Sequence, residues 1–487
     1  MQRLSKQTLG NVSRGVIRPR IINPPTGIVH LGAGAFHRAH QVIYTEDAMS
    51  IGGGDWGVCG VSLKSTHVQE ALRPQDCLYT LAVLDTKISH RIVGALSDIL
   101  IAAKELPQVL DAMTAPATHI FTVTVTEKGY CLNINGDLNI DHPDIRHDLQ
   151  YPQTPSSVIG IIAEALRRRF VAGLAPPTVI SCDNLSNNGS LLAKAVLAYA
   201  DLTDREAARW IEDNVCFPCT MVDSITPATD DSLRERVTKE IGLIDMLPVQ
   251  REAYTQWVIE NRFCGPKPEW EAAGAILTDD VVPYENAKLR LLNATHSTLA
   301  YLGLLLDIET VFQAMQNPLL PGFIERMMRV EIAPTVDSLP GLKINDYAAA
   351  ILQRYKNPAI KHYLSQIALD GSQKIPIRIL ETVKNNLAAG RSVGRLCLAV
   401  AGWMHFVRTK TLRGEKVNDP LADKLRTIGA NCTLDASRDV ARFITLKEVF
   451  GQELPNNRDF IEALTEAYKA LDDGSAVAIT SALRSGL

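Results

Sequence analysis

The sequence predicts an α/β, Rossmann-type dinucleotide-binding domain over residues 1–283 and a mostly α-helical C-terminal domain over residues 284–487. Three observations lead to this fold class. A short apolar run, a glycine turn and a helix follow one another near the N-terminus, and strand-like and helix-like segments alternate from there to residue 283. Beyond that point, apolar residues recur with helical spacing.

The first element is a strand that ends in glycines. Residues 28–32 read Ile-Val-His-Leu-Gly, and Gly32 and Gly34 precede a segment typical of a helix. Such a turn lets backbone N–H groups and a helix N-terminus approach a pyrophosphate. His37 occupies the place of the third glycine of G-x-G-x-x-G, so the motif is degenerate. A second strand at 56–63 continues a βαβ unit, and we expect Gly32 and Gly34 to bind a dinucleotide.

The segment after the second strand bears on the choice of cofactor. NAD-binding domains carry Asp or Glu there, which binds the adenosine ribose. This chain has Lys64 and His67 instead, and these side chains would accept a 2′-phosphate. The residues alone are therefore compatible with NAD and with NADP.

Two later strands end in polar residues. Residues 120–126 and 178–182 are rich in β-branched side chains, and they lead into Glu127 and into Asp183-Asn184. A helix is expected between them at 157–169. Open α/β sheets bind ligands at the carboxyl ends of their strands, so both strand ends are candidate binding positions.

The segment from Pro283 to His296 opens the helical domain and gathers polar residues. On an α-helix, Lys288, Glu285, Asn293 and His296 fall within about 140° of one another. Asn293 and His296 interrupt an apolar run, where polar groups must be satisfied or functional. A capped core helix with one hydrogen-bonded histidine is the structural alternative. Helices are expected near 285–305, 344–355, 376–389, 391–408 and 456–471.

Composition excludes several classes of protein. The 487 residues are 46% apolar with a formal net charge of −4, which favours neither nucleic acid nor an anionic membrane as a partner. No apolar run approaches the ~18 residues of a membrane span, and the N-terminus lacks the apolar core of a signal peptide. The scattered cysteines are typical of reduced thiols in the cytoplasm. Cys216 and Cys219 form a C-x-x-C without a second pair, so we expect neither zinc nor redox chemistry there.

Five motifs occur together and in order. They are Gly-x-Gly-x-Phe-His-Arg-Ala-His at 32–40, Thr-Glu-Lys-Gly-Tyr-Cys at 126–131, Ser-Cys-Asp-Asn at 181–184, Phe-Pro-Cys-Thr-Met-Val-Asp at 217–223 and Lys-x4-Asn-x2-His at 288–296. This set resembles the polyol-specific long-chain dehydrogenases, whose branches act on mannitol, arabinitol or fructuronate. The resemblance runs from about residue 28 to the C-terminus. It implies an NAD-dependent, metal-independent and monomeric enzyme that oxidises a secondary alcohol of a small sugar acid or polyol.

The resemblance also implies roles for single residues. Lys288 would be the acid/base, and a buried lysine beside hydrogen-bond donors can have its pKa lowered toward neutrality by desolvation. Ser224 stands where the family usually has Arg, so the match around Asp223 is imperfect. Asn184 and Asn293 would hold the reacting oxygen, and His296 would orient the substrate. Asp223 would lie in the substrate site, and Glu285 would lie on the proton route. The residues that would contact the cofactor are Gly32, Gly34, Phe36, His37, Arg38, Thr126 and Glu127.

Residues 366–378 bear on the substrate. This segment resembles the fructuronate branch, and Lys374 or Arg378 would supply the cation that a uronate carboxylate needs. Against this, residues 362–366 read His-Tyr-Leu-Ser-Gln, where that branch usually has His-Arg-Thr-Trp-Gln. We expect an NAD(P)-dependent enzyme that interconverts D-fructuronate and D-mannonate, with oxidation of mannitol or arabinitol as the alternative.

The residues argue against three other interpretations. Tyr284 and Lys288 fit the Tyr-x-x-x-Lys pair of short-chain dehydrogenases, but residues 271–276 lack the serine that such an enzyme needs. No Cys/His/Glu set suits a zinc alcohol dehydrogenase. A sugar-acid sensor built on a dehydrogenase fold would be expected to lose the lysine, which this chain retains together with Asn293 and His296.

Overall fold

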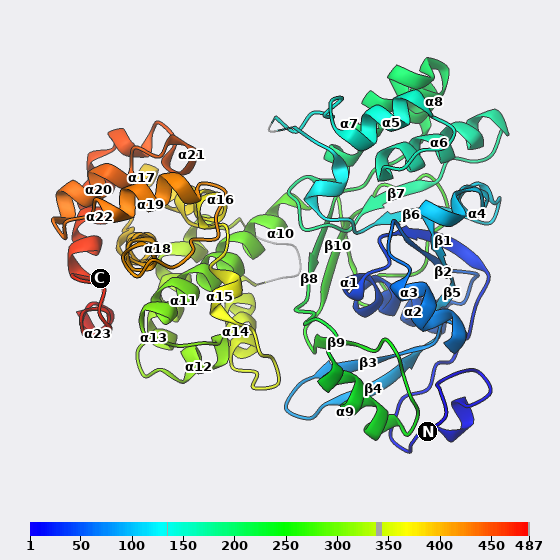
Figure 1. Ribbon diagram of the computed structural model, residues 1–487, viewed down its shortest axis with the longest axis horizontal. Helices are drawn as coiled ribbons and strands as arrows, with labels where there is room; N and C mark the ends of the chain where they lie inside the picture. The colour runs from blue at the N-terminus through cyan, green and yellow to red at the C-terminus, as the bar shows by residue number, and fades with distance from the viewer. Residues whose placement is uncertain (134, 338–342, 486–487) are drawn as a thin grey trace. The chain divides into compact units, whose positions relative to one another are not determined.

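The computed structural model describes residues 1–133, 135–337 and 343–485. The chain forms two compact units, Met1–Val282 and Pro283–Leu487. In Figure 1 the ribbon colour runs from blue to green through the first unit and from green to red through the second.

A parallel five-stranded sheet forms the centre of the first unit. Its strands are β1 (Thr26–Leu31), β2 (Gly57–Ser62), β5 (Leu96–Ile101), β6 (Ile120–Val123) and β7 (Thr178–Ser181). Their order is β5-β2-β1-β6-β7, and all neighbouring strands run parallel. The strand order therefore reverses beside β1, between β2 and β6. Doubly wound sheets bind their ligands at such a reversal.

Helices cover both faces of this sheet. They are α1 (Ala35–Ala39), α2 (Gln41–Gly52), α3 (His67–Leu72), α4 (Ala102–Thr114), α5 (Pro143–Gln150), α6 (Val158–Val171), α7 (Asn188–Thr203) and α8 (Arg205–Asn214). A further helix, α9 (Asp231–Ile241), covers another sheet of this unit. Alternate residues of a strand point to opposite faces. Val29 and Leu31 of β1 accordingly pack with α4, α6, α7 and α8, whereas Ile28 packs with α2 and α3. Strands that are apolar on both faces are typical of a buried parallel sheet.

Two three-stranded sheets complete the first unit. One has the order β11-β10-β8, from β8 (Thr220–Asp223), β10 (Gln256–Glu260) and β11 (Ile276–Thr278). The other has the order β4-β3-β9, from β3 (Tyr79–Leu84), β4 (Ser89–Val93) and β9 (Val249–Glu252). In the second sheet, Leu233, Val237 and Ile241 of α9 pack on Ala82 and Ile92.

The second unit is built from helices alone among its described residues. They are α10 (Val282–Ala287), α11 (Ala294–Leu305), α12 (Val311–Gln316), α13 (Leu320–Arg326), α14 (Ile344–Tyr355), α15 (Leu364–Ile367), α16 (Gly371–Ile375), α17 (Glu381–Ala388), α18 (Gly394–Leu412), α19 (Ala422–Ala430), α20 (Ala436–Phe443), α21 (Lys447–Phe450), α22 (Arg458–Ala470) and α23 (Ala476–Ser485). Three π-helical turns join some of them: η4 (Lys288–Asn293), η5 (Met327–Ile332) and η7 (Pro376–Leu380).

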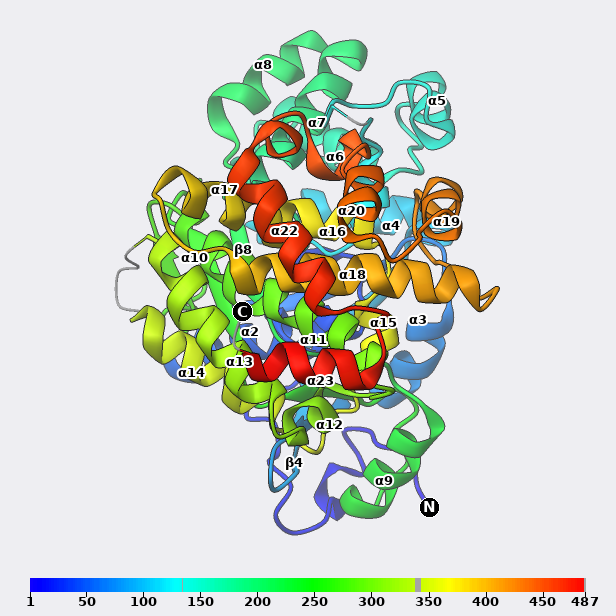
Figure 2. The ribbon, with the colours of Figure 1, turned by 90° about the vertical axis from the view of Figure 1, so that its left-hand side faces the viewer.

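The long helix α18 lies at the core of the second unit. Four successive residues from Leu398 to Ala401 are fully buried, and a helix that is buried all round is a core helix. It contacts α11, α19 and α22, and Figure 2 shows α22 crossing it. A Cβ on Gly402 would lie 2.8 Å from the Leu302 side chain, so the glycine permits the close approach of α11.

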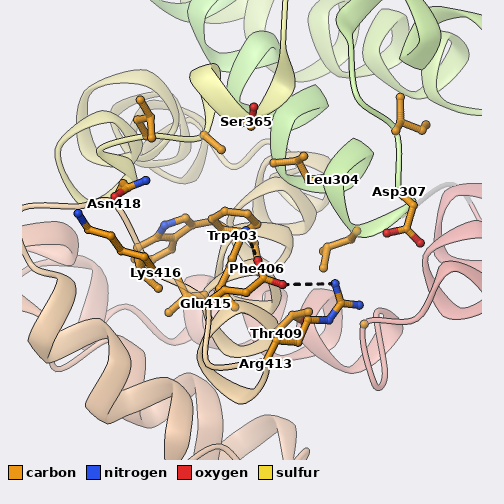
Figure 3. Close-up of a pocket in the computed structure, with 18 of the residues that line it drawn as sticks. Leu304, Asp307, Ser365, Trp403, Phe406, Thr409, Arg413, Glu415, Lys416 and Asn418 are labelled. Carbon is orange, nitrogen blue, oxygen red and sulfur yellow. Dashed lines mark hydrogen bonds and ion pairs between the residues drawn. The ribbon is translucent and has the colours of Figure 1, made fainter.

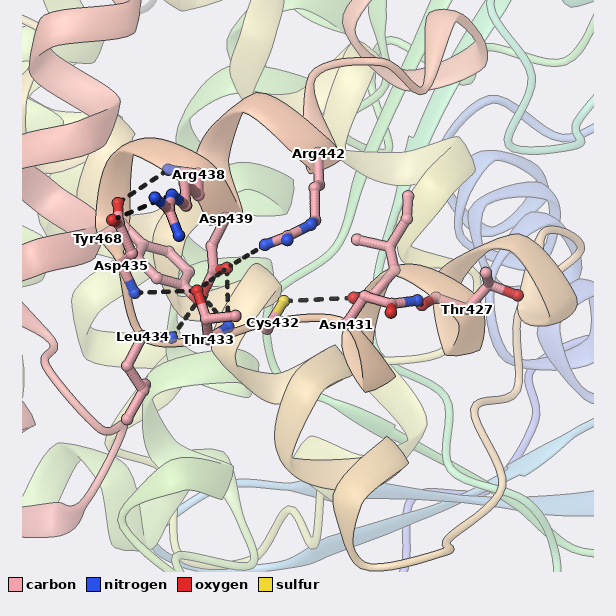
Figure 4. A network of polar contacts seen from close by, with 11 residues as sticks. Thr427, Asn431, Cys432, Thr433, Leu434, Asp435, Arg438, Asp439, Arg442 and Tyr468 are labelled. Carbon is pink, nitrogen blue, oxygen red and sulfur yellow. Dashed lines mark hydrogen bonds and ion pairs between the residues drawn. The ribbon is translucent and has the colours of Figure 1, made fainter.

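A buried carboxylate joins the C-terminal helices. Asp439 of α20 is fully buried and accepts hydrogen bonds from the backbone N–H groups of Thr433 and Leu434, both at 2.9 Å (Figure 4). The guanidinium of Arg442 donates to the same carboxylate at 2.9 Å, and the hydroxyl of Tyr468 on α22 donates to it at 3.3 Å. A buried charge that is satisfied in this way fixes α20 against α22.

The predicted fold class is confirmed: a Rossmann-type α/β domain precedes a mostly helical domain. The expected strands at 28–32, 56–63, 120–126 and 178–182 correspond to β1, β2, β6 and β7. The helix expected at 285–305 is not one regular helix, because the η4 turn separates α10 from α11. None of the described helices is both long and apolar enough to cross a membrane.

Candidate active site

The predicted glycine turn lies at the carboxyl end of β1. Gly32 has a φ of +104°, a conformation that side chains disfavour, and its N–H donates to Val61 O at 2.8 Å. The hydroxyl of Thr124 donates to Gly32 O at 2.9 Å, and Nε2 of His30 lies 3.0 Å from the same oxygen. Contacts from β1, β2 and the end of β6 therefore hold the turn at the reversal of strand order.

Replacement of Gly32 by alanine should unfold or severely destabilise the first unit. The added Cβ would lie 2.0 Å from Thr124 O, and the positive φ adds backbone strain, so we expect a loss of about 3 kcal/mol or more. Gly34→Ala is the matched control, because its Cβ would meet nothing closer than 3.7 Å. Urea unfolding of both variants checks this, and equal stability for the two would contradict it.

The residues after the turn divide between exposed and buried positions. Gly34 is exposed, and the ring of Phe36 is partly buried and stacks on His40 with centroids 4.9 Å apart. His37 and Arg38 are buried: the His37 ring stacks on His30 at 3.3 Å, and the Arg38 guanidinium donates to Leu247 O at 2.8 Å. The side chains of His37 and Arg38 thus pack into the core behind the turn.

His30 is held neutral by the fold. Burial lowers its pKa to about 3, although the hydrogen bond to Gly32 O opposes this shift. Gly32 O can only accept, so Nε2 carries the proton and Nδ1 accepts from the Thr122 hydroxyl at 2.7 Å. A second proton would place a charge beside the stacked ring of His37.

Acid should therefore destabilise the first unit. The pKa of His30 is lower in the folded state than in the unfolded state, so its contribution is complete above pH ~6.5 and is lost as the pH falls. Between pH 7 and pH 5 we expect His30 to account for a loss of about 2 kcal/mol. Urea unfolding at both pH values should show a smaller loss for His30→Asn, but an unchanged loss for His67→Asn, because His67 is exposed.

The ends of β6 and β7 are tied together by Asp183. Its carboxylate accepts from the N–H groups of Val125 and Thr126 at 3.0 and 2.9 Å and from the Tyr130 hydroxyl at 2.8 Å. Thr126 has a φ of +66°, so these bonds hold the exposed segment that carries Thr126 and Glu127. The sequence marked Asp183 as part of a candidate binding position, and in the structure its carboxylate bonds to groups of the first unit. The neighbouring Asn184 is exposed.

Asp223 is the last residue of β8. It is buried and pairs with Gln256 across the antiparallel β8–β10 ladder. The next residue, Ser224, donates its hydroxyl to Tyr254 O at 3.1 Å. The position where the family usually has arginine therefore holds a short side chain that bonds within the first unit.

In the second unit, four predicted residues occupy the segment around the η4 turn. Glu285, Lys288 and Asn293 are each 8% exposed, and His296 is 7% exposed. The lysine opens the π-helical turn and Asn293 ends it. Single π turns in helices are frequent at functional sites, because they displace side chains from their regular positions.

His296 lies among aromatic and basic side chains of its own unit. Its ring lies 4.7 Å from the Tyr355 ring and 5.0 Å from the His362 ring. Burial, followed by the charges of His362, Arg354 and Arg378, lowers the pKa of His296 well below its ordinary value. Its Nε2 is buried and has no hydrogen-bond partner among the described residues. A neutral imidazole with an unused nitrogen suits a ligand hydroxyl.

Arg378 lies beside Asn293 and is held by neutral groups. Its guanidinium donates to Ser297 Oγ at 3.1 Å and to Asn293 O at 3.4 Å, and no carboxylate of the described residues pairs with it. Burial lowers the pKa of Arg378. A partly buried cation without an acidic partner is a candidate anion site.

Lys374 lies near Arg378 on the α16 helix. Its Nζ donates to Ile367 O at 3.3 Å, and its pKa is lowered by burial and then by the charge of Arg378, whereas Asp370 and Asp419 oppose the shift. Lys374 is thus a second cation close to Arg378, but one with acidic groups nearby.

His362 and Tyr355 were missed by sequence reasoning. Tyr355 donates its hydroxyl to Leu292 O at 2.9 Å and lies 2.8 Å from the Thr295 hydroxyl, so it supports the segment that carries Asn293. Burial lowers the pKa of His362 to about 4. Tyr355 ends the helix predicted at 344–355, whereas His362 lies outside every predicted helix. Neither position indicated a contact with His296, because these contacts span dozens of residues of sequence.

A separate cavity of about 950 Å³ lies within the second unit. Figure 3 shows Trp403 and Phe406 of α18 and Leu304 of α11 at this cavity, with Glu415 paired with Arg413. Lys410 also donates to the Glu415 carboxylate. None of the residues predicted for catalysis or binding lines it.

No group of three or more His, Cys, Asp or Glu side chains suited to a metal ion occurs among residues 1–133, 135–337 and 343–485. Catalysis without a metal stays a prediction.

Comparison with known proteins identifies relatives along the whole chain. The Mannitol dehydrogenase Rossmann domain matches residues 26–272, and the Mannitol dehydrogenase C-terminal domain matches residues 280–472. D-mannonate oxidoreductase of Escherichia coli is 40% identical over 94% of this chain and 95% of its own length. Mannitol 2-dehydrogenase of Phaeosphaeria nodorum is 36% identical over 98% of this chain and 86% of its own length.

A solved structure agrees with these matches. The mannitol 2-dehydrogenase of Pseudomonas fluorescens, in a ternary complex with NAD and D-mannitol, covers 99% of both chains with a TM-score of 0.84 and 35% identity. Both domain matches and the relatives confirm the predicted enzyme class and resemblance. The chain therefore belongs to the mannitol dehydrogenase family of oxidoreductases.

Proposed function

We propose that this enzyme interconverts a keto-uronate and its aldonate, D-fructuronate and D-mannonate, by NAD-dependent hydride transfer. The proposal is based on the environment of Arg378. This guanidinium lies beside Asn293 and His296, and neutral groups are its hydrogen-bond partners among the described residues. A substrate carboxylate would compensate its charge and form the short, charge-assisted hydrogen bonds that arginine favours.

Lys288 is the proposed acid/base. In the oxidative direction its amine takes the proton of the substrate hydroxyl as hydride leaves the same carbon, and in the reductive direction its ammonium returns that proton. Lys288 is 8% exposed, and burial disfavours a charged ammonium. Glu285, one helical turn earlier and equally buried, is the proposed route by which the proton reaches solvent.

Asn293 and His296 position the reacting group. The amide of Asn293 donates to the developing alkoxide, and loss of one such donor costs about 3 kcal/mol. The unused Nε2 of the neutral His296 is the proposed partner of a substrate hydroxyl. The matching roles of Asn184 and Asp223 stay predictions from the family resemblance.

NAD is the proposed cofactor, and it supplies the hydride acceptor when bound. The glycine turn at the reversal of strand order fits a dinucleotide, since Gly34 leaves open space where a side chain would stand. Gly32 and Gly34, the ring of Phe36 and the exposed segment with Thr126 and Glu127 are the proposed contacts. His37 and Arg38 contribute through their backbones and through packing behind the turn.

Discrimination between NAD and NADP should be modest. Lys64 follows β2, and its side chain is largely exposed. Its Nζ lies 3.7 Å from a carboxylate oxygen of Asp144, so a positive and a negative side chain both lie near the expected position of the ribose. We expect a preference for NAD below about a thousandfold, on the order of 4 kcal/mol. Steady-state kinetics with both cofactors measure this ratio. A larger preference would show that a further acidic side chain reaches the ribose.

A second candidate function is oxidation of an uncharged polyol such as mannitol or arabinitol. It is favoured by the likeness to mannitol 2-dehydrogenases and by the departure of residues 362–366 from the fructuronate pattern. The test is NADH-dependent reduction of D-fructuronate and of D-fructose, with the product identified by NMR. Formation of mannonate supports the proposal, whereas turnover of fructose alone would contradict it.

A further inference from the structure

Two cysteines of the first unit lie in contact although they are 48 residues apart in sequence. The backbone N–H of Cys216 donates to Cys264 Sγ at 2.7 Å, and the Cys264 thiol donates to Pro177 O at 3.4 Å. The Cys216 thiol is also close enough to raise the pKa of the Cys264 thiol. Neither residue belongs to the predicted active site.

Strand pairing brings the two cysteines together. In the antiparallel β8–β10 ladder Thr220 faces Ile259, and the next bond outward runs from Glu260 N–H to Cys219 O at 2.9 Å. The same register places Cys216 beside the residues that follow β10. Both cysteines are also fixed to β7, because Val179 N–H donates to Cys216 O and Cys264 N–H donates to Thr178 Oγ1 at 3.0 Å. The surrounding strands thus hold the backbones of Cys216 and Cys264 close together.

The two cysteines of the C-x-x-C motif contact different residues. The thiol of its second cysteine, Cys219, lies 3.7 Å from the Ser190 hydroxyl, whereas the backbone N–H of its first cysteine donates to Cys264 Sγ. Cys216 and Cys264 are partly exposed, so a small oxidant has access to them. Burial, followed by the hydrogen bond with Cys216, raises the pKa of Cys264 to about 12. Cys264 therefore stays a thiol, and Cys216 is the cysteine that reacts first.

We propose that Cys216 and Cys264 form a reversible disulfide when the protein meets a hydroperoxide. The Cys216 sulfur attacks one peroxide oxygen: an S–O bond forms, the O–O bond breaks, and the departing oxygen leaves as water or alcohol. The Cys264 sulfur then attacks the sulfenic sulfur of Cys216. The S–S bond forms, the S–O bond breaks, and the thiol proton leaves with the hydroxyl as water. The two sulfurs lose two electrons in total, which reduce the peroxide, and a thiol reductant reverses the change.

The bond would connect the segment that enters β8 to the segment that leaves β10. β8 ends at Asp223, so the cross-link would fix the strand that carries a predicted substrate residue. A cross-link between residues 48 apart also restricts the unfolded chain. The oxidised protein should therefore unfold at a higher temperature than the reduced protein.

The test is oxidation of the full-length protein with hydrogen peroxide, followed by alkylation of free thiols and peptide mapping. We expect a mass loss of about 2 Da and one cross-link between the peptides that carry Cys216 and Cys264, with Cys219 alkylated. Dithiothreitol should reverse both changes. Cys216→Ser and Cys264→Ser should abolish the cross-link, whereas the matched variant Cys219→Ser should retain it.

Three outcomes would overturn the proposal. They are a Cys216–Cys219 disulfide, alkylation of both Cys216 and Cys264 after peroxide treatment, and accumulation of sulfinic acid on Cys216 with Cys264 still free. Thermal unfolding gives an independent readout, since peroxide should raise the transition of the wild-type protein and of Cys219→Ser. Peroxide should not raise the unfolding temperature of Cys264→Ser, and an increase equal to that of the wild-type protein would also contradict the proposal.

Discussion

Lys288→Ala should reduce kcat by about two to four orders of magnitude, the usual contribution of a positioned acid/base. Alanine provides no group that can take the hydroxyl proton. The glycine turn belongs to the first unit, so binding of NADH should remain, and titration by NADH fluorescence measures it. Added methylamine should restore part of the activity, because it supplies an amine in the space that the side chain leaves.

The control for this prediction is Lys384→Ala. Lys384 lies on α17 of the same unit, where its Nζ pairs with Glu381 at 2.8 Å, and its replacement should leave kcat unchanged. Wild-type turnover by Lys288→Ala would refute the lysine mechanism. Loss of NADH binding in that variant would show instead that the substitution disturbs the fold.

Arg378→Met should raise the KM for D-fructuronate about ten- to a hundredfold, with little change for D-fructose. The two ketoses differ in that one ends in a carboxylate and the other in a hydroxymethyl group. A hydrogen bond to a charged group contributes about 1.5–3 kcal/mol, which corresponds to that range. Arg378→Lys keeps the charge but loses the forked geometry, so its effect should be intermediate.

Lys374→Met tests the contribution of Lys374 independently of that of Arg378. Lys374 has Asp370 and Asp419 nearby, whereas Arg378 has neutral partners, so we expect a smaller rise in the KM for fructuronate than with Arg378→Met. Circular dichroism of each variant controls for folding. Equal losses with fructuronate and fructose would show that these cations support the site or bind hydroxyls, and that neither recognises a carboxylate.

Much of the first unit could be predicted from the sequence, because its central strands are buried on both faces. Residues 120–126 are apolar or β-branched throughout, and residues 28–31 are so apart from His30. Polar residues or glycine bound both runs, which is the signal of a parallel sheet. The two three-stranded sheets gave no comparable signal. A strand as short as β11, with three residues, completes only one alternation of side chains.

The candidate site was predictable where its residues are close in sequence. Lys288, Asn293 and His296 fall on one segment, and each is buried in the structure. The η4 turn could not be foreseen, because a helical wheel assumes a constant period and a π turn breaks it. The packing of His362 on His296 and the contact between Cys216 and Cys264 also escaped prediction, since each depends on the folding of distant segments.

Recognition of a carboxylate by this enzyme can be measured as the ratio of two specificity constants. We would measure kcat/KM of the wild-type enzyme for D-fructuronate and for D-fructose with NADH at one pH and ionic strength. We expect fructuronate to be favoured by at least about tenfold, as one charge-assisted hydrogen bond implies. Equal kcat/KM values for the two substrates, or a preference for fructose, would contradict recognition of a carboxylate and favour the polyol function.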